Sequence, residues 1–214
     1  PSRFGHLYIK AGTQEDPTVK KYLAGKPLKP EGRFPVRPQD LNRLIGSPSV
    51  MVPTASKGVV IDGRLDDAAW KKASPLSLKI NSGGGTPVHT TEAKIAADRE
   101  NLYIGFTCFE KEMDFLIADA TGRGNAHWGE DTVEVFIDPY HTHMITYYNI
   151  MVNPVGAFSL AKNGFDKMWN PASFKLKTAL YDDHWIVEFK IAFTDLLKDT
   201  DDFPTIWSLN LIRT

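Results

Sequence analysis

The chain has 214 residues, with 25 Lys and Arg against 26 Asp and Glu, so its formal net charge at pH 7 is −1. This length allows one sizeable domain with a hydrophobic core. The balanced charge gives no electrostatic case for nucleic acid or an anionic membrane as a partner, and no apolar run approaches the roughly 20 residues that span a bilayer. The single cysteine, Cys108, excludes an intrachain disulfide, and its apolar neighbours predict a buried thiol.

Residues 1–57 are predicted to form a Pro-rich arm or linker with two short helices. Eight of the 14 prolines lie in this segment. Capping signals predict the helices near 16–25 and 38–46, and the stretch between them is expected to be extended. Because the arm has little to bury by itself, we expect it to pack on the following domain or on another chain. The first residue is Pro1 rather than methionine, which predicts a removed leader or a longer parent chain.

From residue 58 onwards the pattern is that of short strands with hairpin-scale connections. A strand near 59–61 is followed by a helical turn with Trp70 packed inward and Asp66 or Asp67 as its cap, and a second short helix is predicted near 193–199. Other segments alternate apolar and polar side chains with the period of two that is typical of strands. These segments are 91–98, 102–110, 132–138, 145–153, 156–161, 173–180, 184–191 and 207–214. Because the crossover helices of a parallel sheet are missing, the sequence predicts an all-β antiparallel sandwich over residues 58–214.

Catalytic and phosphate-binding motifs are missing from the sequence. There is no nucleophile elbow, P-loop, dinucleotide fingerprint or zinc-protease motif, and the glycine-rich stretch at 82–87 is predicted to be a mobile loop. His141 and His143 form a His-x-His pair, but they lie in a predicted turn without a third ligand, so solvated histidines are the favoured interpretation. No general acid with a matched nucleophile stands out, so the sequence does not favour an enzyme.

Trp128 lies in a loop among Asn, His and Gly, where a large aromatic side chain needs a reason. Two interpretations stay open: an anchor folded onto the edge of the sandwich, or an exposed platform for a ligand. Sugars stack their apolar C–H faces on such rings, while polar side chains bind their hydroxyls. Glu134 on the next strand supplies such a polar group. One face of the strand at 145–153 adds further candidates: Tyr147, Asn149, Met151 and Asn153.

Six segments in order carry a resemblance to a known family. They are "VVIDGRLDDAAWKKASP", "AADRENLYIGFTCFE", "WGEDTVEVFIDP", "YYNIMVNPVGAF", "HWIVEFKIAFTDLL" and "WSLNLIRT". Together they resemble the family-nine carbohydrate-binding modules, within the DOMON-like superfamily of β-sandwiches, over residues 59–214. The resemblance implies a non-catalytic module that binds a mono-, oligo- or polysaccharide. It also implies an extracellular, cell-surface or periplasmic location and a parent chain that continues beyond Thr214.

The resemblance also implies roles for individual residues. Trp128 matches one side of an aromatic clamp, and Glu134 matches a carboxylate that accepts hydrogen bonds from sugar hydroxyls. The family's second clamp tryptophan comes from a segment after the last strand, so within this sequence Trp169 is the candidate for the second ring. An arginine of sugar-binding members aligns with Met151.

Calcium and haem are the two bound groups that the resemblance raises. Calcium occurs in the family, and Asp131 and Asp138 are its candidate ligands here. Some DOMON-like sandwiches hold haem b between Met and His or Lys, which would make the chain an electron carrier with Met151 and either His127 or His143 as ligands, although no spacing pairs them.

A further alternative is an interaction or assembly module with no sugar ligand, which would dock on neighbouring domains or subunits through the N-terminal arm. Its motivation is the length of residues 1–57, which lack a core of their own.

Overall fold

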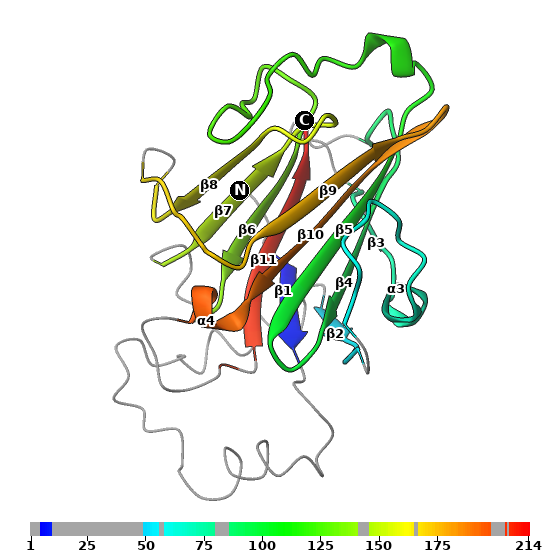
Figure 1. Ribbon diagram of the computed structural model, residues 1–214. Coiled ribbons are helices and arrows are strands. Elements are labelled where there is room, and N and C mark those ends of the chain that lie inside the picture. Colours follow the sequence, from blue (N-terminus) through cyan, green and yellow to red (C-terminus); the bar gives the residue numbers. More distant parts are fainter. Residues whose placement is uncertain are drawn as a thin grey trace, which may run out of the picture.

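The computed structural model describes residues 5–9, 49–55, 58–79, 86–140, 146–164, 167–197, 204 and 206–214. Within this part of the chain two β-sheets, one of six strands and one of five, pack face to face (Figure 1). The predicted all-β sandwich is therefore confirmed. The helices predicted near 16–25 and 38–46, most of the glycine-rich loop, and His141 and His143 lie outside the described residues.

The larger sheet has the strand order β2-β1-β11-β6-β7-β8. Its strands are β1 (Gly5–Ile9), β2 (Ser49–Val52), β6 (Val133–Asp138), β7 (Tyr148–Val152), β8 (Phe158–Lys162) and β11 (Ile206–Arg213). All neighbours pair antiparallel except β1 and β2, which are parallel. Two stretches of residues 1–57 thus add strands to the sheet of the sandwich that follows, through the pairing of β1 with β11.

The smaller sheet has the order β3-β4-β5-β10-β9 and is antiparallel throughout. Its strands are β3 (Leu76–Ser77), β4 (Thr91–Ala97), β5 (Asn101–Phe109), β9 (Lys175–Leu180) and β10 (His184–Ala192). The helical elements in the described part are short: α3 (Ala68–Lys72), the 3-10 turn η1 (Met113–Phe115) and α4 (Phe193–Leu196). None of these helices is long and apolar enough to cross a membrane.

The main core lies between the two sheets and is built from the apolar faces of the strands. On β5, Leu102, Ile104, Phe106 and Cys108 point into it, and alternate residues of β6, β7 and β10 complete it. Cys108 is fully buried, as predicted, and burial raises the pKa of its thiol to about 12, so it stays uncharged. The period of two in the sequence thus decides which side of each strand is buried.

A second, smaller core covers the outer face of the five-stranded sheet. The segment 58–73 crosses that face and buries Trp70 completely. The strand predicted at 59–61 is wrong, because this segment has no strand partner. Its backbone N–H groups bond to side chains instead: Val60 donates to Asp67 Oδ2 at 3.0 Å. Asp67 does occupy the cap position of α3, but its side chain makes no capping hydrogen bond there.

Candidate functional site

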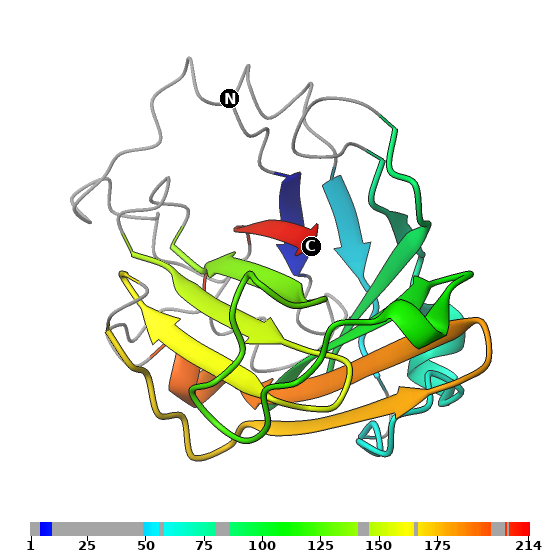
Figure 2. The ribbon, with the colours of Figure 1, turned by 90° about the horizontal axis from the view of Figure 1, so that it is seen from above.

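The loop 116–132 joins η1 to β6 and lies along the start of β8 (Figures 1 and 2). Gly124 N–H donates to the Phe158 carbonyl at 2.6 Å, and Phe158 N–H donates to the Gly122 carbonyl at 3.1 Å. Both glycines have φ near +79°, a left-handed conformation that strains other residues. The glycines therefore let the loop double back and pair with β8 before it reaches Trp128.

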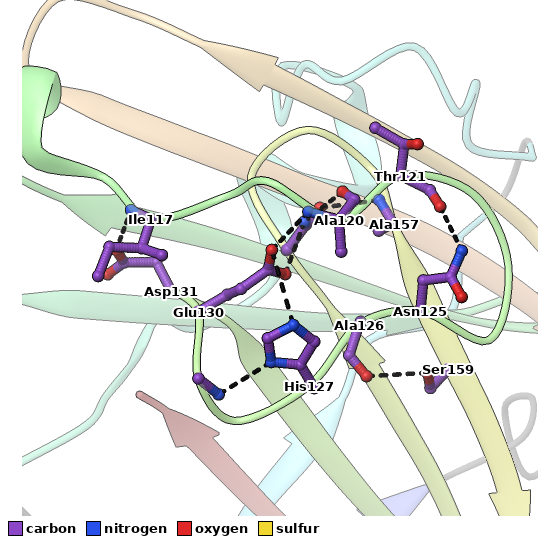
Figure 3. A network of polar contacts seen from close by, with 12 residues as sticks. Ile117, Ala120, Thr121, Asn125, Ala126, His127, Glu130, Asp131, Ala157 and Ser159 are labelled. Atoms are coloured by element: carbon purple, nitrogen blue, oxygen red, sulfur yellow. Dashed lines mark hydrogen bonds and ion pairs between the residues drawn. The ribbon is translucent and has the colours of Figure 1, made fainter.

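Buried Glu130 holds the two arms of this loop together (Figure 3). Its Oε1 accepts from Ala120 N–H at 2.5 Å, and its Oε2 accepts from Asn153 Nδ2 at 3.0 Å. Asn153 Nδ2 also donates to the Ala120 carbonyl at 2.9 Å, and His127 Nε2 lies 4.0 Å from the carboxylate. Burial opposes ionisation, but these hydrogen bonds outweigh it and hold the pKa of Glu130 below its usual value.

Further bonds join the two ends of the loop to each other and its middle to β8 (Figure 3). Asp131 and Ile117 bond twice: Ile117 N–H donates to Asp131 Oδ2 at 2.9 Å, and Asp131 N–H donates to the Ile117 carbonyl at 2.8 Å. Ser159 Oγ on β8 donates to the Ala126 carbonyl at 3.0 Å. Before Trp128 the loop is thus tied to β8 through Ala126, and after it to Asn153, next to β7, through Glu130.

Replacing Glu130 with alanine should lower the free energy of unfolding by about 1 to 3 kcal/mol, because Ala120 N–H and Asn153 lose their buried acceptor. The pKa of Glu130 is lowered by folding, so its contribution is present above the pKa of an ordinary glutamate and is lost as pH falls through the folded value. Urea unfolding at pH 7 and at decreasing pH measures both effects. If the free energies of unfolding of the wild type and of E130A changed in parallel with pH below pH 5, Glu130 would not be the group whose pKa is lowered by folding.

Trp128 lies exposed above the larger sheet and is fixed at its edge by a buried carboxylate. Its side chain is 55% exposed, whereas the other four tryptophans are at most 8% exposed. The indole Nε1–H donates to Glu134 Oε2 at 3.3 Å, and Asn149 Nδ2 donates to Glu134 Oε1 at 2.7 Å. Of the two interpretations that the sequence leaves open, this exposure favours a platform over an anchor packed onto the sandwich.

Glu134 lies on the face of β6 that points away from the main core. It is only 3% exposed, and burial raises its pKa, against the opposing effect of the hydrogen bonds from Asn149 and Trp128. Met151 on β7 is its direct cross-strand neighbour. Met151, at which the resemblance implies an arginine in sugar-binding members, is a buried thioether that packs with Ala126 and Ala157.

Of the other predicted sugar-binding residues, Tyr147 lies on the face of the sheet that carries Glu134 and Asn149, and Trp169 lies in the main core. Tyr147 precedes β7, is half-buried, and has its ring centroid 5.8 Å from that of Phe136 on the same face of the sheet. Trp169 is 8% exposed and belongs to the main core, with its ring centroid 4.3 Å from that of Tyr148. The structure thus brings Trp128, Glu134 and Asn149 together, and it places the Trp169 ring between the sheets.

The two candidate calcium ligands lie at opposite ends of β6. Asp131 precedes the strand and accepts from Ile117 N–H, whereas Asp138 ends it and accepts from Tyr140 N–H at 3.2 Å. A strand of this length separates them by roughly 20 Å, so they are too far apart to bind one ion. Among the described residues, no group of three or more His, Cys, Asp or Glu side chains is arranged to hold a metal. Calcium stays a prediction.

The haem alternative pairs Met151 with His127 or His143. Met151 is 4% exposed and packed among alanines, and His127 Nδ1 accepts from Gly129 N–H at 3.1 Å. His143 lies outside the described residues. In the described part, then, the Met151 side chain packs against protein rather than lining a pocket.

Sequence reasoning missed Glu130, and with it the network that shapes the loop. Glu130 stands beside Asp131 in a predicted loop, where an acidic side chain is ordinarily exposed, yet Glu130 is buried. The available signal was Asn153, which the strand alternation placed on the polar face of the strand at 145–153. A buried amide on that face needs a polar partner from a covering segment.

The fold and the family can be compared with known proteins. The model of the family described as "Carbohydrate family 9 binding domain-like" matches residues 61–208. No curated protein matches the sequence.

Solved structures share the fold. A carbohydrate-binding module of family 9 from Caldicellulosiruptor kristjanssonii in complex with cellotriose aligns with a TM-score of 0.55 and 21% identity, over 75% of this chain and 74% of that chain. The same module in complex with glucose aligns with a TM-score of 0.55 and 21% identity, over 75% of each chain. A protein from Bacteroides uniformis aligns with a TM-score of 0.59 and 13% identity, over 77% of this chain and 82% of that chain. With the family model covering more than half of its length, the chain belongs to the carbohydrate family 9 binding domain-like family.

Proposed function

We propose that the chain is a non-catalytic carbohydrate-binding module in which Trp128 stacks against a sugar ring. The observation that carries the proposal is the exposed indole held at its edge by a buried carboxylate. Indole rings that are fixed but uncovered offer a large apolar face at little entropic cost. The sugar's C–H face would cover the part of the ring that now faces water.

Glu134 and Asn149 supply the polar half of the site. Each carboxylate oxygen of Glu134 already accepts one hydrogen bond and has a second lone pair. Because Glu134 is buried, a sugar hydroxyl would reach it at the edge of the Trp128 ring. There it would replace the contact from the indole Nε1, which at 3.3 Å is the longer of the two. Sugar binding would thus change the contacts of the Trp128 ring and of the Glu134 carboxylate at the same time.

Glucose units are the first ligands to test. The family 9 module from Caldicellulosiruptor kristjanssonii was solved with cellotriose and with glucose, and a single stacking ring suits a pyranose with equatorial hydroxyls. One ring with few hydrogen bonds predicts modest affinity, on the order of micromolar to millimolar. Modules of this family are typically parts of extracellular proteins, so we place this module on an extracellular or cell-surface protein.

Tryptophan fluorescence tests the proposal directly, because Trp128 is the one exposed indole among the five. We expect cellotriose to shift the emission to shorter wavelength and to protect it from quenching by acrylamide. Calorimetry on the same samples should give a matching dissociation constant. No spectral change and no heat with cellotriose, glucose or a broad glycan array would overturn the proposed function.

Sugar affinity should weaken on mild acidification. Burial raises the pKa of Glu134, so this carboxylate takes up a proton at a higher pH than an ordinary glutamate. The protonated form loses acceptor capacity for a sugar hydroxyl, so binding should be strongest above the raised pKa and should fall as pH drops through it. Calorimetry with cellotriose from pH 8 to 4 measures this. In E134Q this loss of affinity with falling pH should vanish. If the loss were the same in E134Q, another group would be responsible for the pH dependence.

A further inference from the structure

A second surface lies at the end of the sandwich where η1, the β7–β8 connection and the β9–β10 hairpin meet (Figures 1 and 2). A groove of about 510 Å³ opens between them. Its lining residues are Met113, Asp114, Leu116, Ala118, Asp119, Pro154, Val155, Leu180, Tyr181 and Asp182. None of the residues that we assign to sugar binding lines it.

Apolar side chains are unusually exposed in and around this groove. Leu180 at the end of β9 is 54% exposed and Val155 is 46% exposed. Phe115 and Ile117, the chain neighbours of lining residues, are 78% and 53% exposed. Single exposed apolar residues are ordinary, but several from three separate segments around one groove mark a contact surface. The centre of a protein interface is apolar, and the aliphatic side chains of Leu180, Val155 and Ile117 do not offer the flat ring on which a sugar stacks.

The charged residues that line the groove are all acidic. Asp114, Asp119 and Asp182 line it, and no lysine, arginine or histidine is among its lining residues in the described part of the chain. The chain as a whole is nearly neutral, so these three carboxylates are a local excess of negative charge. A partner that covered the apolar centre would desolvate them, and only a cationic partner would compensate that cost.

Tyr181 gives the groove a rigid wall. Its ring stacks on that of His184 with centroids 4.4 Å apart and planes 6° apart, and His184 Nδ1 lies 2.6 Å from Asp183 Oδ1. Tyr181 N–H also donates to the His184 carbonyl at 2.9 Å, which closes the hairpin. A wall fixed in this way loses little side-chain entropy when a partner binds.

From the apolar centre and the acidic rim together, we propose that this groove is a docking site for a basic protein segment. The partner segment places an apolar side chain against Leu180 and Tyr181, and flanking lysines or arginines pair with the three aspartates. The site is separate from the sugar-binding site at Trp128, although Ala118 and Asp119 belong to the same loop 116–132. The module would thus bind a sugar on one surface and a protein on another.

The probe for this site is a short fluorescent peptide that alternates lysine and leucine, titrated into the full chain and followed by fluorescence anisotropy. A peptide with glutamate in place of lysine tests the sign of the charge, and one with serine in place of leucine tests the apolar contribution. We expect only the lysine–leucine peptide to bind, with affinity that falls as salt rises.

Matched variants locate the binding. Leu180→Ser removes an apolar contact and should weaken binding by about tenfold, the loss expected for a central interface anchor. Val88→Ser, which alters a residue that is 88% exposed and outside the groove, should leave it unchanged. The triple variant D114N/D119N/D182N should bind at least about tenfold more weakly. Its control, D66N/E92Q/E100Q, removes the same charge elsewhere and should bind as the wild type does.

Several outcomes would overturn the docking site. These are no binding of the lysine–leucine peptide, equal binding of the glutamate peptide, or equal loss in a groove variant and its control. Displacement of the peptide by cellotriose would place it at the sugar site instead, and binding of cellotriose that depends on Leu180 would make the groove a saccharide site. Because the peptide titration needs no sugar, its result is independent of whether Trp128 binds one.

Discussion

Replacing Glu188 with alanine is expected to lower the free energy of unfolding by about 3 to 5 kcal/mol, a large loss for one side chain. Glu188 lies on the outer face of β10 and is fully buried. Its Oε1 accepts from Trp70 Nε1 at 2.8 Å, and its Oε2 accepts from Asp62 N–H at 2.9 Å and Gly63 N–H at 2.8 Å. Alanine would leave these three donors without an acceptor. It would also open a cavity beneath segment 58–73.

Urea unfolding followed by circular dichroism measures this loss. Glu188→Gln retains the shape and one acceptor oxygen, but its NH₂ group faces a donor, so we expect an intermediate loss of about 1 to 3 kcal/mol. Glu100→Ala changes an exposed glutamate and should stay within about 0.5 kcal/mol of the wild type. If E188A lost less stability than E188Q, the carboxylate would not be the group that holds segment 58–73 on the sheet.

The strands of the sandwich could be predicted because each has one face in the main core. On β5 and β10 the side chains that alternate in the sequence are those buried between the sheets, and the two strands pair along their full lengths. Such a pattern is local: it needs no knowledge of what the strand pairs with. The same reasoning predicted the polar face of β7, which carries Asn149.

Glu188 and segment 58–73 could not be predicted in this way. On β10 the alternation assigns Glu188 to the outer face, and an acid on an outer face is normally solvated. It is buried because a segment more than a hundred residues earlier covers it, so its role depends on long-range contacts. The apolar run Val59, Val60 and Ile61 looks like a strand, yet the backbone that follows it bonds to a carboxylate rather than to another strand.

The strands β1 and β2 also could not be predicted, because they form through long-range contacts. Each has four or five residues, and they lie in a segment whose prolines and capping residues predict an arm. The pairing of β1 depends on β11, about 200 residues further along the chain, and β2 pairs in turn with β1. Strand propensity is strongly set by such context, so nothing local marked these stretches as part of the sheet.

At the candidate site, the sequence grouped Trp128 and Glu134 as parts of one binding site, and the structure joins them by the hydrogen bond from the indole Nε1–H to Glu134 Oε2. The sequence could not predict where Trp169 points. Trp169 N–H donates to the Leu160 carbonyl at 3.0 Å, and this bond to β8 directs the ring into the core. A lone tryptophan in a loop offers no periodicity from which its direction could be derived.

Replacing Trp128 with alanine is expected to weaken sugar binding by at least about thirtyfold, or 2 kcal/mol, while leaving the fold intact. The ring is more than half exposed, so its loss should change the free energy of unfolding by no more than about 1 kcal/mol. Trp128→Phe separates two contributions, because it keeps an aromatic face but removes the Nε1–H that bonds to Glu134. We expect an intermediate affinity for this variant.

Calorimetry with cellotriose, together with urea unfolding, distinguishes a ligand platform from a structural anchor. Phe115→Ala removes another exposed aromatic ring outside this site and should leave sugar binding unchanged. If W128A lost several kcal/mol of stability, Trp128 would be an anchor of loop 116–132, and any loss of binding would follow from the disturbed loop. A stable W128A that binds cellotriose like the wild type would place the sugar elsewhere. Only a stable variant whose affinity for cellotriose is reduced to this extent is consistent with Trp128 as the platform, because the ring's exposed face then contributes to the complex and not to the fold.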